Sequence, residues 1–287
     1  MPAEGSMPTG RAPIATGSLR FTVLGCGSSG GVPRIGPSGP HWGDCDPDNP
    51  RNRRRRCSLL IEREGAEGRT TVLVDAGPDV RDQLIAAGAG DLDAVVFTHD
   101  HADHCHGIDD LRMVVFNRRE RLRAYMDPPT EATLMRRFGY VFETPEGSDY
   151  PPILDKRLID GPLEVDGPGG TIGFTPFEVP HGRARALGFR IGPLVYLPDI
   201  SEMTAEAWAA VEGCAVWVLD ALRWRPHPSH ANVETALAWI ERAAAPRAYL
   251  TNLHVDLDYA MLDAATPANV SPAYDGLTLD LPLGAPA

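Results

Sequence analysis

The sequence predicts a protein of the α/β class, in which two mixed β-sheets pack together and helices cover both outer faces. Two observations lead to this prediction. Runs of strand character alternate with amphipathic runs of helical character, and this plan occurs twice along the chain. A chain of 287 residues is also long enough to bury the sizeable core that such a layered fold needs. We expect one domain over residues 19–287, preceded by a disordered extension over residues 1–18, where Pro, Gly, Ala and Ser occur without apolar periodicity.

The first half is expected to contain five strands and three helices. Apolar and β-branched runs predict strands at residues 21–24, 58–61, 71–74, 94–97 and 122–125. Helical spacing predicts helices at residues 80–87, 107–119 and 130–138, with Thr130 able to cap the last one. The segment 140–152 is aromatic and proline-rich without periodicity, so we expect either a lid or a contact between the copies of a homodimer.

The second half repeats the plan. Strands are predicted at residues 174–179, 187–191, 194–197, 215–219, 247–251 and 277–281. Helices are predicted at residues 202–211 and 233–244, of which the second is strongly amphipathic. The alternation therefore continues almost to the end of the chain.

Composition excludes several classes of protein. No apolar run approaches the roughly 20 residues that cross a bilayer, and the N-terminus does not read as a signal peptide, so a cytoplasmic location is expected. Five cysteines at irregular spacing predict free thiols and no disulfide framework. A net charge of -12 disfavours a large nucleic-acid surface. The basic run at residues 51–56 is either a solvated loop or a device that attracts an anionic substrate.

A dense cluster of ligand-type residues follows the strand at 94–97. Residues 98–104, which we call the histidine turn, contain His99, His101, Asp103 and His104 in the pattern HxHxDH. Because alternate residues of an extended turn point the same way, His99 and His101 share one side, and Asp103 and His104 face a neighbouring spot. Imidazole and carboxylate suit zinc, manganese or iron, and the lack of thiolate ligands favours a hydrolytic site over a structural zinc.

This motif resembles the signature of the metallo-β-lactamase superfamily, and the resemblance extends from about Leu19 onward. It implies an αββα sandwich with two divalent metal ions, zinc or manganese. By resemblance, one ion is held by His99, His101 and His181, the other by Asp103, His104 and His254, and Asp199 bridges the two. The motif Asp75-Ala76-Gly77 implies that Asp75 supports the histidine turn and is not itself a ligand.

The last ligand departs from the superfamily pattern. Many relatives have Leu-Thr-His at this point, whereas here Asn252 stands at the histidine position and His254 lies two residues later. Because residues two apart on an extended segment share a side, His254 is expected to replace the missing ligand.

The ligand set predicts the class of substrate. Two divalent ions carry +4, and two aspartates with a bridging hydroxide subtract three, so the centre keeps a net charge of about +1 that favours an anion. Paired metals also activate the bridging water and clamp the attacking and leaving oxygens of an in-line displacement. We therefore expect the bridging hydroxide to cleave a small anionic phosphodiester.

Further details resemble one branch of the superfamily, the phosphoribosyl cyclic phosphate phosphodiesterases of phosphonate breakdown, close to the tRNA 3′-processing endonucleases. The resemblance rests on Gly31-Val32-Pro33, on Cys57-Ser58 after the basic run, and on Ser229-His230-Ala231-Asn232. It implies a cyclic phosphate as substrate, with Asp103 and His230 as catalytic residues and His230 as the general acid. With Cys45 as the only remaining cysteine of its zinc-binding segment, no structural zinc is expected.

Two further functions stay open from the sequence. A nucleotide or RNA 3′-end phosphodiesterase would use the same centre, although no basic inserted arm for gripping RNA is evident. The turn at residues 27–33 also resembles that of the protein of pyrroloquinoline quinone synthesis, which implies an iron-dependent oxygenase or a cofactor-maturation role. A non-catalytic binding protein would be expected to have lost ligands that this chain retains.

Overall fold

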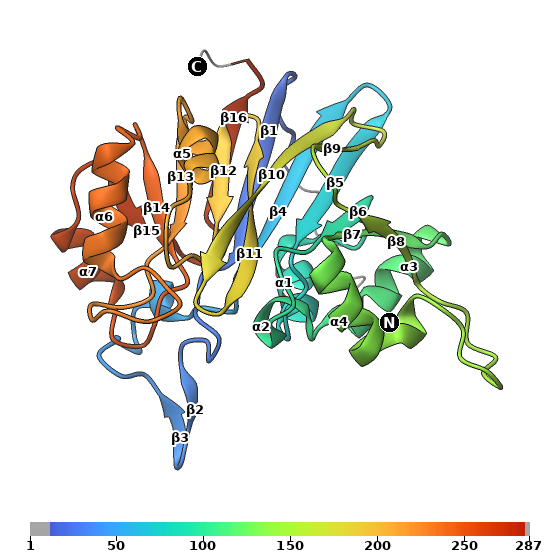
Figure 1. The fold of residues 1–287 in the computed structure, drawn as a ribbon, viewed down its shortest axis with the longest axis horizontal. Helices are drawn as coiled ribbons and strands as arrows, with labels where there is room; N and C mark the ends of the chain where they lie inside the picture. The colour runs from blue at the N-terminus through green and yellow to red at the C-terminus, as the bar shows by residue number, and fades with distance from the viewer. Residues whose placement is uncertain (1–11, 285–287) are drawn as a thin grey trace, which may run out of the picture.

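The computed structural model describes residues 12–284, in which two seven-stranded sheets pack together with helices on the outer faces (Figure 1). This confirms the fold class predicted from the sequence. No helix among the described residues is long and apolar enough to cross a membrane.

The first sheet comes mostly from the first half of the chain. Its strands in spatial order are β16 (Thr278–Pro282), β1 (Ser18–Gly25), β4 (Ser58–Gly65), β5 (Gly68–Val74), β6 (Ala94–Val96), β7 (Leu122–Met126) and β8 (Leu154–Leu158). The strands from β16 to β5 pair antiparallel, and those from β5 to β8 pair parallel. The carboxyl ends of β5 and β6 therefore lie at the same edge.

The second sheet has the same plan. Its strands in spatial order are β15 (Val270–Pro272), β14 (Ala248–Thr251), β13 (Val216–Asp220), β12 (Leu194–Leu197), β11 (Ala184–Ile191), β10 (Ile172–His181) and β9 (Leu163–Val165). The strands from β12 to β15 are parallel. Because parallel strands end together, residues that follow β12, β13 and β14 are brought to one edge.

An apolar core joins the two sheets. It combines Phe21 and Ile61 of the first sheet with Phe174, Phe189 and Tyr196 of the second. The rings of Phe174 and Phe189 meet edge to face, with centroids 5.8 Å apart. The central parallel strands β6 and β13 are buried on both faces, which is why every residue of β6 and nearly every residue of β13 is apolar.

Helices cover the outer faces of both sheets (Figure 1). Beside the first sheet lie α1 (Val80–Ala87), α2 (Ala102–Cys105), α3 (Arg112–Arg118) and α4 (Pro128–Phe138), and beside the second lie α5 (Ala205–Val211), α6 (Val233–Arg242) and α7 (Tyr259–Ala265). Each group has its own apolar cluster against its sheet. Short 3₁₀ turns occur at Pro50–Asn52, Ile108–Leu111 and Gly139–Val141.

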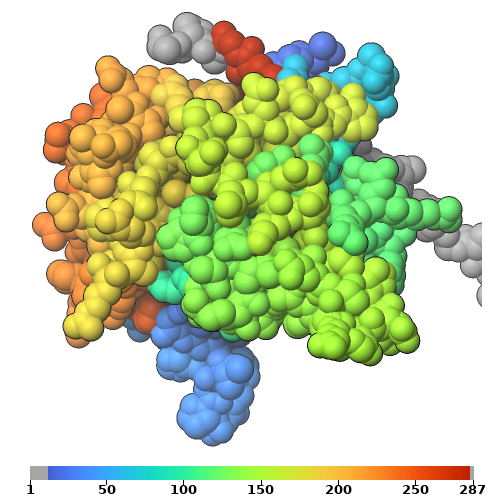
Figure 2. Space-filling view, turned by 45° about the vertical axis from the view of Figure 1, so that its right-hand side comes forward, coloured from blue at the N-terminus to red at the C-terminus, as the bar shows by residue number. Residues whose placement is uncertain are grey.

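Several elements differ from the prediction. Helix α4 begins at Pro128, not Thr130, because the side chain of Asp127 accepts a hydrogen bond from the Thr130 N–H at 3.0 Å. The helix predicted over residues 107–119 divides into a 3₁₀ turn and α3. The hairpin of β2 (Arg34–Gly36) and β3 (Gly39–His41) was not predicted, and it projects from the body of the protein (Figure 2). Helix α7 was not predicted either.

The predicted N-terminal extension needs a correction at its end. Ile14 is buried, and its N–H donates to Glu64 Oε2 at 2.8 Å, while Arg20 bonds the carbonyl of Ala12 at 2.7 Å. These contacts tie residues 12–17 to the first sheet, because one apolar side chain and paired backbone groups suffice to hold a short segment. Residues 1–11 of the expected extension lie outside the described residues.

The segment 140–152 is partly packed. Val141 and Phe142 are buried, the Tyr140 hydroxyl bonds the Asp109 carboxylate, and Tyr150 is largely exposed. Pro152, its last residue, is buried as well, so the segment is anchored at both ends and mostly exposed between them. Its action as a lid or as a dimer contact stays a prediction.

Candidate metal centre

The histidine turn leaves the first sheet at the end of β6. Its imidazoles come close together, since the ring centroid of His99 lies 4.5 Å from that of His101 and 4.3 Å from that of His104. His99 and His104 are buried, and His104 lies in α2, where the chain begins to coil. Three imidazoles from six consecutive positions thus face one small volume.

Asp75, directly after β5, holds this turn in place. Its fully buried carboxylate accepts hydrogen bonds from His104 Nδ1 at 2.7 Å and from the Thr98 N–H and hydroxyl, both at 2.8 Å. The bond to Nδ1 leaves His104 Nε2 directed toward the other histidines. Burial raises the pKa of Asp75, while the His104 side chain acts in the opposite direction. These are the contacts expected of a residue that orients the turn.

The second sheet supplies one side chain from each of several strand ends. His181 is the last residue of β10, and Asp199 lies two residues beyond β12. His181 Nδ1 donates to the Ser229 carbonyl at 2.6 Å, so its Nε2 faces the histidine turn and lies 3.1 Å from His101 Nδ1. Burial lowers the pKa of His181, which favours the neutral imidazole that a metal ligand requires.

Asp199 lies between two groups of ligand-type atoms. Its Oδ2 is 3.0 Å from His104 Nε2, whereas its Oδ1 is 3.7 Å from His181 Nε2. Within the described residues, three sets have ligand atoms within 4.8 Å of one another: His99 with His101 and His181, His99 with His104 and Asp199, and His181 with Asp199 and His230. One carboxylate thus faces both halves of the cluster.

The cluster fits metal ions by a direct physical test. His99 Nε2 is buried and has no hydrogen-bond partner, and the buried His104 Nε2 and Asp199 Oδ2 have only each other, at 3.0 Å. Each buried polar atom left in this state costs about 1 to 3 kcal/mol, which a bound cation would offset. Burial also lowers the pKa of His99 well below its ordinary value, so its nitrogen is a lone-pair donor. Separations near 3 Å suit neighbouring ligands that each lie about 2.1 Å from one ion.

Asp103 lies at the open side of the cluster. Its Oδ2 is 3.5 Å from His104 Nε2, and its side chain is 16% exposed. It is therefore the carboxylate of the histidine turn that both solvent and the cluster can reach.

His230 is oriented by a buried carboxylate that the sequence did not single out. Asp220, the last residue of β13, accepts a hydrogen bond from His230 Nδ1 at 2.9 Å. Burial raises the pKa of Asp220 to about 7. Burial lowers the pKa of His230, but the Asp220 carboxylate outweighs this effect and raises the pKa to about 9. Nδ1 is also the His230 nitrogen that lies 3.5 Å from Asp199 Oδ1. Because Nδ1 already donates to Asp220, it is not free to bind a metal ion beside Asp199.

The structure places Asn252, and not His254, against the cluster. Asn252 Nδ2 lies 3.1 Å from Asp199 Oδ1, and the residue is buried. His254 Nδ1 pairs with Asp256 Oδ1 at 2.9 Å, and His254 belongs to none of the three sets of ligand atoms in the described residues. The expected shared side fails because β14 ends at Thr251 and Asn252 has φ of 62°, so the chain is not extended here. A ligand role for His254 stays a prediction.

The arginines of the basic run have partners within the chain. Arg51 stacks on the rings of Tyr259 and Tyr274, Arg53 lies over Trp42, and Arg54 bonds Asn52. The remaining two form ion pairs: Arg55 with Asp275 at 3.0 Å and Arg56 with Asp79 at 2.9 Å. These contacts fasten the long loop before β4, which is a structural role for the run.

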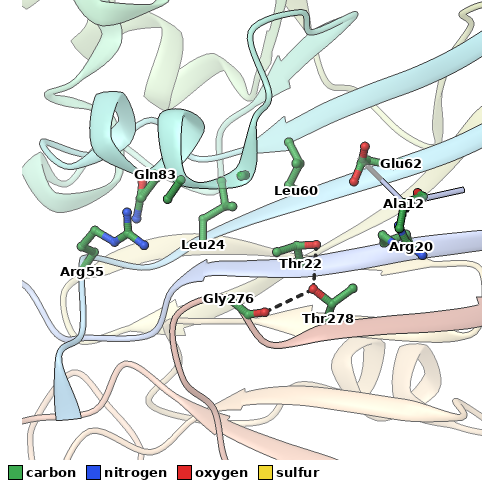
Figure 3. Close-up of a pocket in the computed structure, with 12 residues that line it drawn as sticks. Ala12, Arg20, Thr22, Leu24, Arg55, Leu60, Glu62, Gln83, Gly276 and Thr278 are labelled. Atoms are coloured by element: carbon green, nitrogen blue, oxygen red, sulfur yellow. Dashed lines mark hydrogen bonds between the residues drawn. The ribbon is translucent and has the colours of Figure 1, made fainter. Parts of the chain in front are cut away.

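A hollow of about 250 Å³ on the first sheet lies apart from this chemistry (Figure 3). It lies beside α1, over β1, β4 and β16, where Thr22, Leu24 and Leu60 contribute side chains. None of the predicted ligands lines it. The candidate site is therefore the cluster at the strand ends.

The five cysteines are all free, as predicted, and all are buried.

Two contributors to the site were missed by sequence reasoning. Asp220 carries the same signal as Asp199, an aspartate at the end of an apolar run, but no motif distinguished it. The Ser229 carbonyl, which orients His181, is a backbone group and leaves no trace in residue type. Both depend on which strands and loops lie side by side.

A comparison with protein families adds an independent line of support. A family model described as "Beta-lactamase superfamily domain" matches residues 70–252, more than half of the chain. Among curated proteins, the chain is 33% identical over 266 residues to an octanoyltransferase of Porphyromonas gingivalis, covering 90% of this chain and 51% of that protein. It is 31% identical over 78 residues to a ribonuclease Z of Deinococcus radiodurans, covering 27% of this chain and 24% of that protein. The chain thus spans about half or less of the length of these relatives.

Solved structures share the fold, and one of them also shares sequence. A diphosphatase of the PhnP family is 32% identical with a TM-score of 0.81, and the match covers 93% of this chain and 98% of that chain. Zinc-bound PqqB from Methylobacterium extorquens, at 20% identity and a TM-score of 0.68 over 91% of this chain and 100% of that chain, shares the fold. The chain therefore belongs to the beta-lactamase superfamily, with the metallo-β-lactamase fold and a likeness to the PhnP family.

Proposed function

We propose that this protein is a metal-dependent hydrolase that cleaves a small phosphodiester, with a cyclic phosphate as the preferred form. The observation that carries the proposal is the position of Asp199, whose two oxygens face His104 and His181 respectively. A carboxylate in that position is suited to be shared by two ions. Dinuclear centres of this kind serve displacement at phosphorus.

The ligands divide into two sets. His99, His101 and His181 would hold the first ion, and Asp103 and His104 would hold the second, with Asp199 shared. Nitrogen and carboxylate donors without thiolate suit Zn²⁺ or Mn²⁺. When bound, such ions polarise the phosphoryl group and activate a water molecule for attack on phosphorus. Two divalent ions against two aspartates leave a positive site, which favours an anionic substrate over a neutral amide or thioester.

His230 is suited to protonate the leaving oxygen. Asp220 fixes its Nδ1, so the opposite nitrogen, Nε2, is the one available to a substrate. The Asp220 carboxylate also raises the pKa of His230, which favours the protonated imidazole. A general acid needs both a fixed direction and a proton to give.

The names of similar proteins support chemistry at phosphorus. The PhnP-family structure is called a diphosphatase, and a shorter match is called a ribonuclease Z. A diphosphate is therefore the second candidate substrate, because the same centre would attack phosphorus and expel a phosphate oxygen. A nucleotide or RNA 3′ end remains the third. Acyl transfer is named for a protein of which this chain spans only 51%, and all five cysteines here are buried, so no thiol is placed to accept an acyl group.

A substrate panel tests the proposal. Metal-loaded protein is compared on bis(p-nitrophenyl) phosphate, a cyclic phosphate, a diphosphate, a thioester and a lactam. We expect hydrolysis of the phosphate compounds only, with the cyclic phosphate ahead of the diphosphate. Faster cleavage of the thioester or the lactam would contradict the proposal.

A second experiment tests the role of His230. His230→Ala should slow hydrolysis of an alkyl phosphodiester by about 10²- to 10⁴-fold, because the alkoxide then leaves without a proton. Hydrolysis of a p-nitrophenyl ester should change far less, since that leaving group needs little protonation. His227→Ala is the matched control, because its ring centroid lies 5.2 Å from that of His230 while its Nδ1 pairs with Ser229 and not with Asp220. Metal content is measured for both variants, because Ser229 also orients His181. Equal losses on both substrates, or loss of metal, would rule out the proton-donor role.

A further inference from the structure

The end of β14 differs from the other strand ends of the site. We propose that the second metal position is incomplete in this chain, because Asn252 stands where a ligand histidine is expected and does not act as a ligand. Asp103, His104 and Asp199 then hold the second ion without a second imidazole. This position should bind its ion more weakly than the first and should discriminate less between Zn²⁺ and Mn²⁺. The inference rests on the proposed dinuclear centre.

The orientation of the Asn252 amide excludes it as a ligand toward Asp199. Its Nδ2 lies 3.0 Å from the Pro198 carbonyl, which can only accept a hydrogen bond. That contact identifies the atom as the NH₂ group and settles which way the amide points. The same nitrogen lies 3.1 Å from Asp199 Oδ1. Asn252 therefore donates to the shared carboxylate, and an amide NH₂ has no lone pair for a cation.

The backbone directs His254 away from the gap. Asn252 adopts φ of 62°, in the left-handed region, so alternation along the strand stops at this residue. The His254 N–H then donates to the Leu222 carbonyl at 3.0 Å, and its Nδ1 pairs with Asp256. The side chain is 21% exposed, whereas those of His99, His104 and His181 are almost fully buried. His254 is thus held at the rim by partners of its own.

The two positions consequently differ in donor chemistry. The first has three imidazoles and one oxygen of Asp199, and the second has one imidazole and two carboxylates. Imidazole favours Zn²⁺, while oxygen donors suit Mn²⁺ comparatively well. Fewer protein ligands also leave more of the coordination shell to water. The second position should therefore bind its ion more weakly than the first, and should prefer Zn²⁺ over Mn²⁺ by a smaller factor.

Metal titration of the full chain tests the inference without an activity assay. Apo protein is titrated with Zn²⁺ and, separately, with Mn²⁺ by calorimetry, and the ions retained after dialysis are counted by elemental analysis. We expect two steps, the second weaker by about tenfold or more, a difference comparable to the loss of one supporting contact in a metal site. With Mn²⁺, the affinities of the two steps should differ by a smaller factor than with Zn²⁺.

Two variants separate the candidate residues. Asn252→His restores an imidazole at a backbone conformation that histidine tolerates, and should strengthen the second step by about 10- to 100-fold. His254→Ala should leave both steps unchanged. If His254→Ala loses the second ion, or if the wild-type protein binds two ions equally tightly, the inference is wrong. A folded Asn252→His protein with an unchanged second step would overturn it as well.

The titration distinguishes failure of the proposed asymmetry between the two metal positions from failure of the proposed function. Should Asn252→His not fold, the wild-type titration and His254→Ala decide the matter by themselves. Protein that binds no ion in either step would overturn the proposed function. Two equally tight ions would overturn only the asymmetry.

Discussion

The first sheet delivers its side chains from one turn, whereas the second delivers them singly from separate strand ends. The histidine turn brings four ligand-type residues within six positions, and its geometry is set by hydrogen bonds that Thr98 and His104 donate to the Asp75 carboxylate. In the second sheet, His181 and Asp199 come from different strands, and Asp220 and Asn252 from two more. The first arrangement depends on local geometry, and the second on the register of four strands.

The two halves of the site should therefore respond differently to the loss of one side chain. A single buried carboxylate supports most of the histidine turn, so its loss should loosen several ligands at once. In the second sheet each side chain has separate support, such as the Ser229 carbonyl for His181 and the Asp220 carboxylate for His230. Only Asp199, which faces both halves, should affect the whole centre.

The largest effect is expected from Asp199→Ala. Loss of the shared carboxylate should release both ions and reduce hydrolysis by about 10⁴-fold or more, the scale seen when a group on which the whole site depends is removed. Elemental analysis and turnover on bis(p-nitrophenyl) phosphate measure the two outcomes. Asp256→Ala is the control, since this carboxylate pairs with His254 outside the ligand sets. Retention of two ions by Asp199→Ala would show that the two halves do not share a ligand.

The next effect concerns the support of the histidine turn. Asp75→Ala removes the acceptor of His104 Nδ1 and of the Thr98 N–H, and should weaken metal binding by about 10- to 100-fold. Asp75→Asn retains one acceptor oxygen and should lose less. Competition with a chelator measures the affinities. An unchanged affinity in Asp75→Ala would mean that packing alone orders the turn.

A smaller effect is expected when the support of His181 is disturbed in the second sheet. A Cβ at Gly182 would lie 2.7 Å from the Ser229 Cβ, and Gly182 has φ of 65°, so Gly182→Ala strains the loop that bonds His181. We expect a loss of about 1 kcal/mol or more in stability and a smaller loss of metal affinity than in Asp75→Ala. Gly173→Ala in β10 is the control, because nothing lies within 4 Å of its Cβ. Thermal unfolding and metal titration give the comparison. If Gly182→Ala and Gly173→Ala had the same stability and the same metal affinity, the loop at Ser229 would not be needed to orient His181.

The smallest effect should appear in thiol reactivity. Cys105 lies in the histidine turn region, with its Sγ donating to the His101 carbonyl at 3.1 Å, and Cys214 lies in the second half. Burial raises the pKa of Cys105 to about 12 and also raises the pKa of Cys214, so both should react slowly in the metal-loaded protein. Removal of metal should speed the labelling of Cys105 and leave that of Cys214 unchanged, as mass spectrometry would show. Equal changes at both thiols would mean that the two halves depend on metal alike.

The fold class and the position of the histidine turn could both be predicted from the sequence. Strand and helix periodicities are local, and for that reason α1 was predicted with its observed bounds. The histidine turn could also be predicted, because four ligand-type residues within six positions must lie near one another. His181 and Asp199 followed from their strand ends, once the superfamily order was applied.

The contacts around the cluster that join distant segments could not be predicted from the sequence. The pairing of Asp220 with His230 depends on the loop after β13 folding back on itself, where the Leu222 N–H donates to the Ala231 carbonyl at 2.9 Å, and no local sequence pattern reveals this. The choice between Asn252 and His254 depends on one backbone dihedral angle, because a residue with φ of 62° ends the alternation on which the prediction relied. Such angles are set by neighbouring strands and loops, here by the contacts of Asn252 with Pro198 and Asp199.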